Sequence, residues 1–485
     1  MRRNTLLMAG LCLTLGVQAQ TELQPQKWPD LPLLNIVTTN NVPLENNIIT
    51  APEGCIGQTT DNDYVGASLV MTFKGDTLLN TGNYLPDESG IRIRIRGNNT
   101  GVNNPQHPLK LKLTKKADLI TPQQAIAPEK DWVLLSGMAW NPKFTNNLSS
   151  ILSWAGTALS RIMGMEWTPR TTFVNVMING DYQGLYTLIE SVERDKKRIN
   201  IDKKGFIIEN DVYFWKYDKY FRTDHQLSYM GYTFKYPDPD DIDDDRLEDI
   251  AEFMNDFEKK LYEGNDISQY IDLESFARWI LAHDLLGSLD GAGTNMYISK
   301  EKFDPENPLE GGPMKMCVLW DFDSVFRSKP NQFAGCHMYD FFIYPKLFKR
   351  QNFCDIYCKL YAKIRPNLVD TFKSDLQKMI DTYAVPYKES MALHTKVYPN
   401  EQYKSLAMQV DEVLGQLQKR LTFLDEMIPK LSAVDNVEMG NDNRPVAVYD
   451  LNGLRYSIDK LPQLPRGVYL IRYANGQVVR KLAGK

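Results

Sequence analysis

Residues 90–96, Gly-Ile-Arg-Ile-Arg-Ile-Arg, and residues 109–113, Leu-Lys-Leu-Lys-Leu, alternate apolar and charged side chains with a period of two. This alternation predicts β-strands that bury one face and expose the other. Clusters of Asn, Gly and Pro separate these strands from a similar segment that begins at Ser68. We therefore expect residues 20–130 to be rich in strands.

The next eighty residues combine helix and strand signals. Residues 146–163 place apolar side chains at helical spacing. Residues 173–178 and 186–190 flank Asn179-Gly180-Asp181, a sequence typical of a hairpin turn, and a further short strand is predicted at residues 206–209.

The second half of the chain is mostly helical in pattern. Amphipathic spacing is found from Leu247 onward, including residues 272–286 and several stretches between residues 344 and 431. We predict an α+β fold of two lobes, with a strand-rich N-terminal half and a helix-rich C-terminal half.

Both ends of the chain differ from this central part. Arg2 and Arg3 precede an apolar run from Leu6 to Val17 with a small residue, Ala19, for cleavage, so we expect a secretory signal peptide. Residues 445–485 predict short strands and tight turns after a polar linker. The predicted segments are a signal peptide at 1–19, an N-terminal lobe at 20–195, a C-terminal lobe at 196–434, and a linker with a small β-module at 435–485.

Composition excludes several classes of protein. The 485 residues are 43% hydrophobic with a net charge of −5, which suits a globular chain and does not favour nucleic acid as a partner. No apolar run after the signal reaches the ~18 residues of a membrane span, so none is expected. Nucleophile-elbow, Walker A, zincin and dinucleotide-binding motifs are absent from the sequence, and it has only five His. Cys354 and Cys358 at helical spacing suggest a metal site with His337, but buried thiols are the favoured interpretation.

One constellation is suited to phosphoryl transfer. Asp290-Gly-Ala-Gly-Thr-Asn295 precedes a predicted hairpin whose return strand ends at Trp320-Asp321-Phe322-Asp323, so the three Asp and the Asn are expected at one edge. Kinases use an Asp to orient the acceptor hydroxyl, and an Asn and an Asp to hold Mg²⁺. The spacing of Asp290 and Asn295 equals that of the kinase catalytic loop. The alternative is that these Asp residues cap turns.

A kinase also needs a Lys on a strand to hold phosphates. Lys110 and Lys112 share one face of the 109–113 strand, although a solvated strand face is the favoured interpretation of either Lys taken alone. Glu190 and Glu209 each close an apolar strand, where they would pair with that Lys, line the adenine edge, or form a buried structural ion pair.

Taken in order along residues 30–330, these segments resemble the spore coat protein H (CotH) kinase family. The resemblance includes the 146–163 helix and rests otherwise on short motifs, which are Arg94-Ile-Arg-Gly-Asn-Asn-Thr100, Pro108-Leu-Lys-Leu-Lys-Leu113, Asp131-Trp-Val-Leu-Leu135, Ile178-Asn-Gly-Asp-Tyr-Gln-Gly-Leu-Tyr-Thr-Leu-Ile-Glu190, Asp290 with Asn295, and Trp320-Asp-Phe-Asp323.

The resemblance implies an atypical protein-kinase-like fold that transfers the γ-phosphate of ATP, with Mg²⁺ or Mn²⁺, to Ser or Thr of secreted or envelope proteins. It implies that Asp290 is the catalytic Asp and that Asn295 and Asp321 are metal ligands, with Asp323 as a second acidic ligand. It implies Lys112 as the phosphate-binding Lys. Gln106-His107 stands where the family has Lys-Lys, so Lys110 remains an alternative, and Glu190 is a candidate for the adenine pocket.

The C-terminal module resembles the sorting domain of type IX secretion substrates. The matching segments are Tyr449-Asp-Leu-Asn-Gly453, Leu464-Pro-Arg-Gly-Val-Tyr-Leu-Ile471 and Lys481-Leu-Ala-Gly-Lys485. The resemblance implies the type IX secretion machinery as a partner, with passage through the periplasm to the cell surface or medium. The competing interpretation is a small β-sandwich that binds a partner or carbohydrate.

ATP is scarce outside the cell, and this keeps two other functions open. One is a kinase-shaped surface or adhesion scaffold that has lost catalysis. The other is a different metal-dependent phosphoryl or nucleotidyl transferase.

Overall fold

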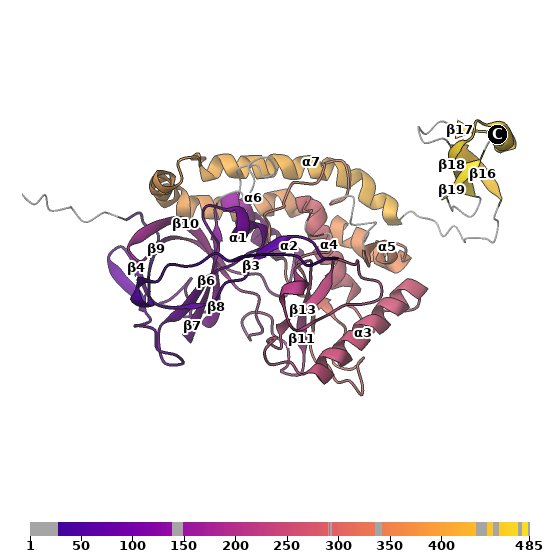
Figure 1. The fold of residues 1–485 in the computed structure, drawn as a ribbon. Coiled ribbons are helices and arrows are strands. Elements are labelled where there is room, and N and C mark those ends of the chain that lie inside the picture. The colour runs from indigo at the N-terminus through magenta and orange to yellow at the C-terminus, as the bar shows by residue number, and fades with distance from the viewer. Residues whose placement is uncertain are drawn as a thin grey trace, which may run out of the picture.

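The computed structural model describes residues 28–137, 149–289, 291, 293–334, 342–432, 444–449, 455–473 and 478–483. The expected signal peptide and the linker after residue 432 lie outside these ranges. The described chain has a mixed α+β architecture, with a strand-rich N-terminal half and most of its helices in the C-terminal half (Figure 1).

The N-terminal half is a closed β-barrel. Its strands follow the order β1-β9-β10-β8-β7-β6-β4, and β4 pairs again with β1, which closes the ring. A further strand, β5 (Asp76–Asn80), extends the sheet beyond β4. The barrel strands are β1 (Leu33–Thr38), β4 (Val65–Phe73), β6 (Ile91–Ile95), β7 (Leu109–Ala117), β8 (Glu129–Ser136), β9 (Thr171–Ile178) and β10 (Asp181–Glu190).

The two-residue period of these strands separates the inside of the barrel from its outside. Alternate apolar side chains pack into one buried core, while Lys110 and Lys112 of β7 lie on the opposite face. The core includes Leu34, Ile36, Leu69, Met71, Ile91, Ile93, Leu109, Leu111, Leu113, Trp132, Leu134, Val174, Val176 and Leu188.

A second sheet begins the C-terminal half. It is antiparallel, in the order β12-β13-β11-β14-β15. The strands of this sheet are β11 (Phe206–Asp211), β12 (Tyr220–Phe221), β13 (Gly231–Tyr236), β14 (Met296–Lys300) and β15 (Lys315–Met316). The strand predicted at residues 206–209 is β11, which continues to Asp211.

The return strand predicted at residues 315–320 is shorter than expected. Strand β15 ends at Met316, and the prediction of a strand up to Trp320 was wrong. The Cys317 amide still donates to the Tyr297 carbonyl of β14 over 3.1 Å, and the next carbonyl, that of Val318, accepts from the Trp279 indole of α4 over 3.1 Å. Residues 317–320 are nevertheless buried.

Helices pack over both sheets. They are α1 (Asn99–Asn103), α2 (Ser149–Met163), α3 (Asp244–Glu263), α4 (Leu273–Leu286), α5 (Tyr344–Leu347), α6 (Gln351–Val397) and α7 (Leu406–Ser432). Asp272 caps α4 by accepting from the Glu274 and Ser275 amides, and Gly287 ends it with a left-handed φ of 56°. This end of α4 leads directly into the segment that contains Asp290. No helix among the described residues combines the length and apolar character needed to cross a membrane.

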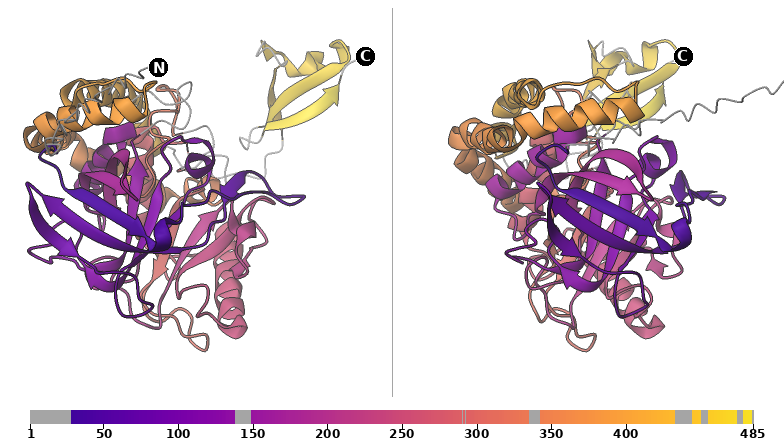
Figure 2. Two further views of the ribbon diagram at one scale, coloured as in Figure 1. Left: turned by 60° about the vertical axis from the view of Figure 1, so that its left-hand side comes forward. Right: turned by 90° about the vertical axis from the view of Figure 1, so that its left-hand side faces the viewer.

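The 47-residue helix α6 joins the two halves, and with α7 it runs above both of them (Figures 1 and 2). Asn175 on β9 donates to Ser390 over 3.0 Å, and the Leu185 amide on β10 donates to His394 Nδ1 over 3.1 Å. At its other end, the Tyr357 hydroxyl donates to Asp284 of α4 over 2.5 Å. One helix therefore binds the barrel and the C-terminal half to each other.

The last described segments form a small antiparallel sheet in the order β17-β16-β18-β19. Its strands are β16 (Pro445–Tyr449), β17 (Arg455–Tyr456), β18 (Gly467–Tyr473) and β19 (Val478–Ala483). A 3-10 helix, η3 (Ile458–Gln463), lies between β17 and β18. A small core of Val448, Leu464, Tyr469 and Ile471 holds the sheet together.

Glu258 of α3 is a buried carboxyl that lowers stability at neutral pH. Thr223 donates to its Oε1 over 2.7 Å, and its Oε2 has no partner among the described residues. Burial raises the pKa of Glu258 to about 8. Because the folded state holds the proton more tightly than the unfolded chain, this contribution to stability is complete below pH 4.5 and is lost as the pH rises toward 8.

We predict that Glu258→Gln removes this pH dependence. The wild-type free energy of unfolding, measured by denaturant titration, should fall by about 1.4 kcal/mol for each unit by which the pKa is raised, and the variant should be more stable at pH 8. Glu248→Gln, at an exposed position of the same helix, is the control. Parallel pH profiles for wild type and Glu258→Gln would contradict the prediction.

Candidate functional site

The central cleft lies between the barrel and the second sheet and has a volume of about 660 Å³. Strands β6 and β7 with the end of β10 contribute to one wall, and β11, β14 and residues 320–323 contribute to the other. Four of the predicted site residues line it, namely Lys110, Asn295, Asp321 and Asp323. Asp290 lies outside the described residues, although its neighbours Leu289 and Gly291 are described.

Lys110 is the cation of the barrel wall. Its ammonium lies 3.0 Å from Asp131 Oδ1 and 3.3 Å from Glu193 Oε1, and it donates to Ser191 Oγ over 2.7 Å. Burial alone would lower the pKa of Lys110, but the charges of Glu193 and Asp131 outweigh it and raise the pKa above its usual value. Lys110 is therefore a firmly protonated cation whose side chain is only 15% exposed.

Two other predicted residues are placed differently. Lys112 is half-buried on the same face of β7, in register with Asp131, but it does not line the cleft. Glu190 is buried at the end of β10, where the Arg170 guanidinium donates to its Oε1 over 2.6 and 2.9 Å and the Arg170 amide to its Oε2 over 2.9 Å. Glu190 does not line the cleft either.

The opposite wall contains residues in an unusual backbone conformation. Asn295 has a φ of 53° and Asp321 has a φ of 59°, both in the left-handed region. Asn and Asp tolerate this region better than most residues, but it still stores strain that surrounding contacts must hold. Such strain is concentrated at functional sites, which supports a chemical role for this edge.

A chain of buried hydrogen bonds supports the loop before Asn295. Asn210 of β11 donates its side-chain amide to the Gly293 carbonyl, and Gln226 donates to Asn210 Oδ1 over 2.5 Å. The Thr223 amide donates to Gln226 Oε1 over 3.2 Å, and the Thr223 hydroxyl binds Glu258. The position of the loop is thus connected to α3.

The second-sheet wall carries Glu209, a candidate from the sequence, and two charged residues that the sequence analysis did not single out, Lys235 and Asp211. Lys235 Nζ lies 2.9 Å from Glu209 Oε2, and both line the cleft with Tyr297. Burial and the neighbouring Glu209 charge raise the pKa of Asp211 to about 6. Glu209 and Asp211 share one face of β11, so extending the predicted strand by two residues would have placed Asp211 beside Glu209.

A hairpin from the barrel half borders the cleft. It consists of β2 (Ile48–Thr50) and β3 (Gln58–Thr60). The Trp215 indole donates to the Ile56 carbonyl over 3.3 Å, and Lys216 donates to Thr59 over 3.4 Å. The hairpin therefore connects the two walls of the cleft.

The residues at the cleft suit a divalent cation held jointly with phosphates. The amide of Asn295 and the carboxylates of Asp321 and Asp323 are oxygen donors of the kind Mg²⁺ prefers, and Mg²⁺ commonly uses one or two carboxylates plus substrate phosphates. Within the described residues, no three His, Cys, Asp or Glu side chains gather into a ready metal site.

The thiols suggested for a metal site have other surroundings. Cys354 and Cys358 are free thiols that donate to the carbonyls of Phe348 and Ile428, over 3.2 and 3.1 Å. Burial raises the pKa of Cys354 to about 11, which disfavours the thiolate that a metal needs. His337 lies outside the described residues.

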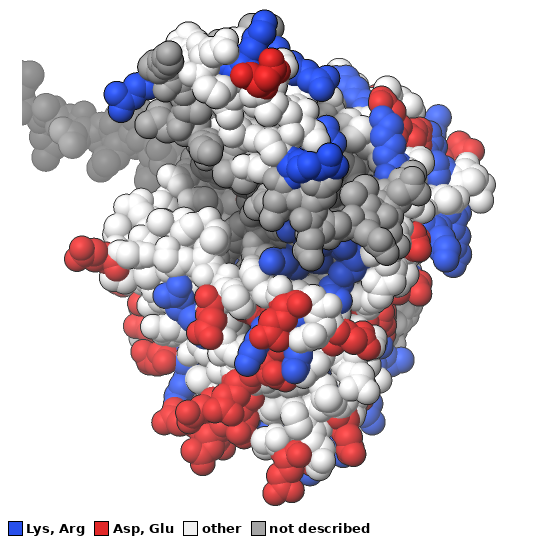
Figure 3. Space-filling model, turned by 90° about the vertical axis from the view of Figure 1, so that its right-hand side faces the viewer, with Lys and Arg blue, Asp and Glu red and all other residues white. Residues whose placement is uncertain are grey.

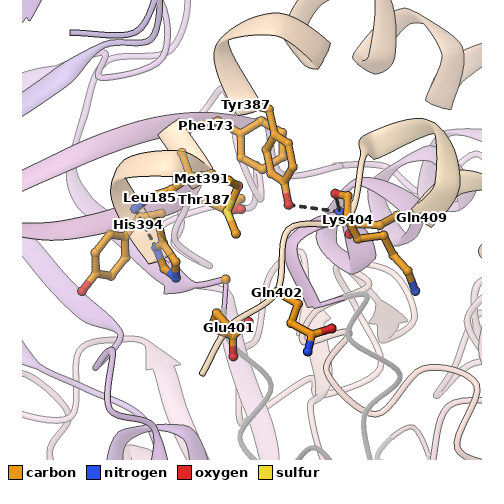
Figure 4. Close-up of a pocket in the computed structure, with 12 residues that line it drawn as sticks. Phe173, Leu185, Thr187, Tyr387, Met391, His394, Glu401, Gln402, Lys404 and Gln409 are labelled. Carbon is orange, nitrogen blue, oxygen red and sulfur yellow. Dashed lines mark hydrogen bonds between the residues drawn. The ribbon is translucent and has the colours of Figure 1, made fainter. Parts of the chain in front are cut away.

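A second cavity, at the end of α6, is much smaller. Figure 4 shows His394, Tyr387, Gln409 and Glu401 around a volume of about 20 Å³, which accommodates about one water molecule. Burial lowers the pKa of His394 to about 4, so its ring is neutral and its Nδ1 accepts from the Leu185 amide. This cavity is a packing feature at the junction of α6 and the barrel.

The surface shown in Figure 3 carries interspersed acidic and basic side chains, with a group of acidic residues near its lower edge.

Comparison with known proteins agrees with a kinase-like class. A family model described as CotH kinase protein matches residues 93–424. This range is more than half of the chain and includes Lys110, Asn295, Asp321 and Asp323. The chain belongs to the CotH kinase family. No curated protein matches it.

Gly156 of α2 fixes the position of Phe322 between the two cleft carboxylates. A Cβ at Gly156 would lie 2.2 Å from the Phe322 ring, which is buried. The absence of a side chain on the helix therefore makes room for the segment that contains Asp321 and Asp323.

We predict that Gly156→Ala lowers the free energy of unfolding by about 1–3 kcal/mol, because overpacking outweighs the better helix propensity of Ala. Gly415→Ala in α7 is the matched control, since a Cβ there meets open space, and it should raise stability by about 0.5–1 kcal/mol. Denaturant unfolding compares the two. Equal stabilisation by both substitutions would show that the packing of the Phe322 ring does not require a glycine at position 156.

Proposed function

We propose that this protein is an exported protein kinase that transfers the γ-phosphate of ATP to Ser or Thr of secreted or envelope proteins. In this proposal the barrel and the C-terminal half are the two lobes of an atypical kinase-like fold, and the nucleotide occupies the cleft between them. The observation that carries the proposal is the central cleft, where Lys110 on one wall faces a wall containing Asn295, Asp321 and Asp323.

Lys110 is assigned the phosphate-binding role in preference to Lys112. It lines the cleft and is protonated, and Asp131, Glu193 and Ser191 hold its ammonium in one position. A fixed cation stabilises phosphate charge without reorganisation during the reaction. Lys112, on the same face of β7, lies outside the cleft lining.

The remaining roles follow the chemistry of phosphoryl transfer. Asp290 is proposed to accept the hydrogen bond of the acceptor hydroxyl and orient it for attack. Asn295 and Asp321, with Asp323 beside them, would hold Mg²⁺ or Mn²⁺. The cation supplies neutralisation of the charge that develops on the phosphates.

The destination of the protein is part of the proposal. The signal sequence at residues 1–19 and the sorting motifs of the C-terminal module support export through the type IX machinery. The acceptor is then expected among proteins of the envelope or the medium.

Phosphate transfer tests the proposed function. Purified full-length chain, incubated with γ-labelled ATP and Mg²⁺ or Mn²⁺, should label itself or a Ser-rich acceptor protein, and Asp290→Asn should abolish the label. Failure of the wild type both to transfer phosphate and to gain melting temperature with ATP and Mg²⁺ would favour an inactive scaffold. Stabilisation without phosphate transfer would favour another transferase reaction.

The assignment of the Lys makes a separate prediction. Lys110→Met should weaken Mg²⁺–ATP binding by more than about tenfold, because the buried pair between the Lys110 ammonium and the ATP phosphates is lost. Lys112→Met should change the affinity by less than about threefold. Each variant is compared with its own ligand-free melting temperature. A larger loss of affinity in Lys112→Met would reverse the assignment.

A further inference from the structure

Arg420 of α7 is a fully buried cation that is distant in sequence from Asn295, Asp321 and Asp323 of the central cleft. Only 1% of the residue is exposed. Its guanidinium donates to main-chain carbonyls on two separate segments, the end of α4 and residues 329–332. A planar fork of five donors can satisfy several carbonyls at once, which a Lys cannot.

The first of these segments is the last turn of α4. Arg420 Nε and Nη2 donate to the Asp284 carbonyl over 2.9 and 2.6 Å. The Asp284 carbonyl also accepts from the capping Gly287 amide over 3.3 Å, and a cation is favoured at this end of a helix. Arg420 therefore fixes the end of the helix that leads to Asp290 and Asn295.

The second segment follows the cleft carboxylates. Arg420 Nη1 donates to the Lys329 carbonyl over 2.9 Å and also to the Gln332 carbonyl. Asp284 reinforces this contact, because its Oδ1 accepts from the Ala334 amide over 2.6 Å.

Main-chain hydrogen bonds join the same two segments closer to the cleft. The Phe326 amide donates to the Leu286 carbonyl over 2.7 Å, and the Ser328 amide donates to the Gly287 carbonyl over 3.0 Å. Phe326 has a φ of 59°, as does Asp321. A bulky residue keeps such a backbone only when its surroundings hold it there.

We propose that Arg420 is a positioning residue for the cleft, which holds residues 321–334 against the end of α4 and thereby sets the affinity for the divalent cation. The proposal rests on the proposed function in one respect, the role of Asp321 as a metal ligand. Arg420 itself does not line the cleft, and in this proposal it acts through the main chain of the two segments.

Two substitutions of Arg420 test this role. Arg420→Lys keeps the charge but loses the fork. Arg420→Met keeps most of the aliphatic stem but removes every donor, and it also takes away the cation that lies 4.0 Å from the buried Asp284 carboxyl. Leu417→Ala is the matched control, because Leu417 is buried one turn earlier on α7 and its truncation lowers stability without removing a donor. All are made in the full-length chain.

The first readout is the Mg²⁺ concentration that gives half of the ATP-induced rise in melting temperature, measured relative to each variant's own ligand-free value. It should rise on the order of tenfold in both Arg420 variants and stay within about twofold of wild type in Leu417→Ala. A general loss of stability does not predict this pattern.

The second readout needs no nucleotide. Hydrogen exchange of the Phe326, Ser328 and Ala334 amides should be faster in the Arg420 variants than in Leu417→Ala. The proposal would be overturned if the Arg420 variants exchanged these amides at the wild-type rate. It would also be overturned if a variant exchanged them faster but kept the wild-type dependence on Mg²⁺ concentration. If wild type shows no ATP-induced stabilisation at all, the proposed function fails, and exchange alone decides whether Arg420 holds the segment.

Discussion

The two-residue period of β7 is the constraint on which the rest of the structure depends. Closing the barrel turns Leu109, Leu111 and Leu113 inward, so the intervening Lys side chains must face outward. A slip of one residue in this strand would bury two ammonium groups in an apolar core and expose the leucines. The register that forms the core therefore also delivers the cation to the cleft.

Two lysines of the cleft, Lys110 and Lys235, are compensated by neighbouring carboxylates. Lys110 is balanced by Asp131 and Glu193, and Lys235 by Glu209. Buried pairs of this kind add little net stability, because desolvation offsets much of their attraction. What they provide is a fixed arrangement of charge, which is what electrostatic catalysis requires.

Much of the architecture could be predicted from the sequence, because it follows from local periodicity. The alternating strands, the hairpin at Asn179-Gly180 and the helical second half needed only the pattern of side chains. The periodicity could not distinguish Lys110 from Lys112, which share a face, whereas in the structure Lys110 lines the cleft and contacts Asp131, Glu193 and Ser191 and Lys112 does not line it. The Val318 carbonyl, just beyond the end of β15, accepts from Trp279, and the partner of Glu190 is Arg170. These outcomes depend on contacts between residues distant in sequence.

The closure of the barrel has a consequence for the order of folding. Strand β1 lies antiparallel to β4 and parallel to β9, and the Thr38 amide donates to Asn179, which is 141 positions away. Such non-local pairing slows folding, because the entropy of closing a long loop is lost before the contacts form. Until β9 has formed and paired with β1, strand β1 has only β4 as a partner and the barrel stays open. A chain that lost β1 would leave β4 and β9 with unpaired edges, which are templates for aggregation.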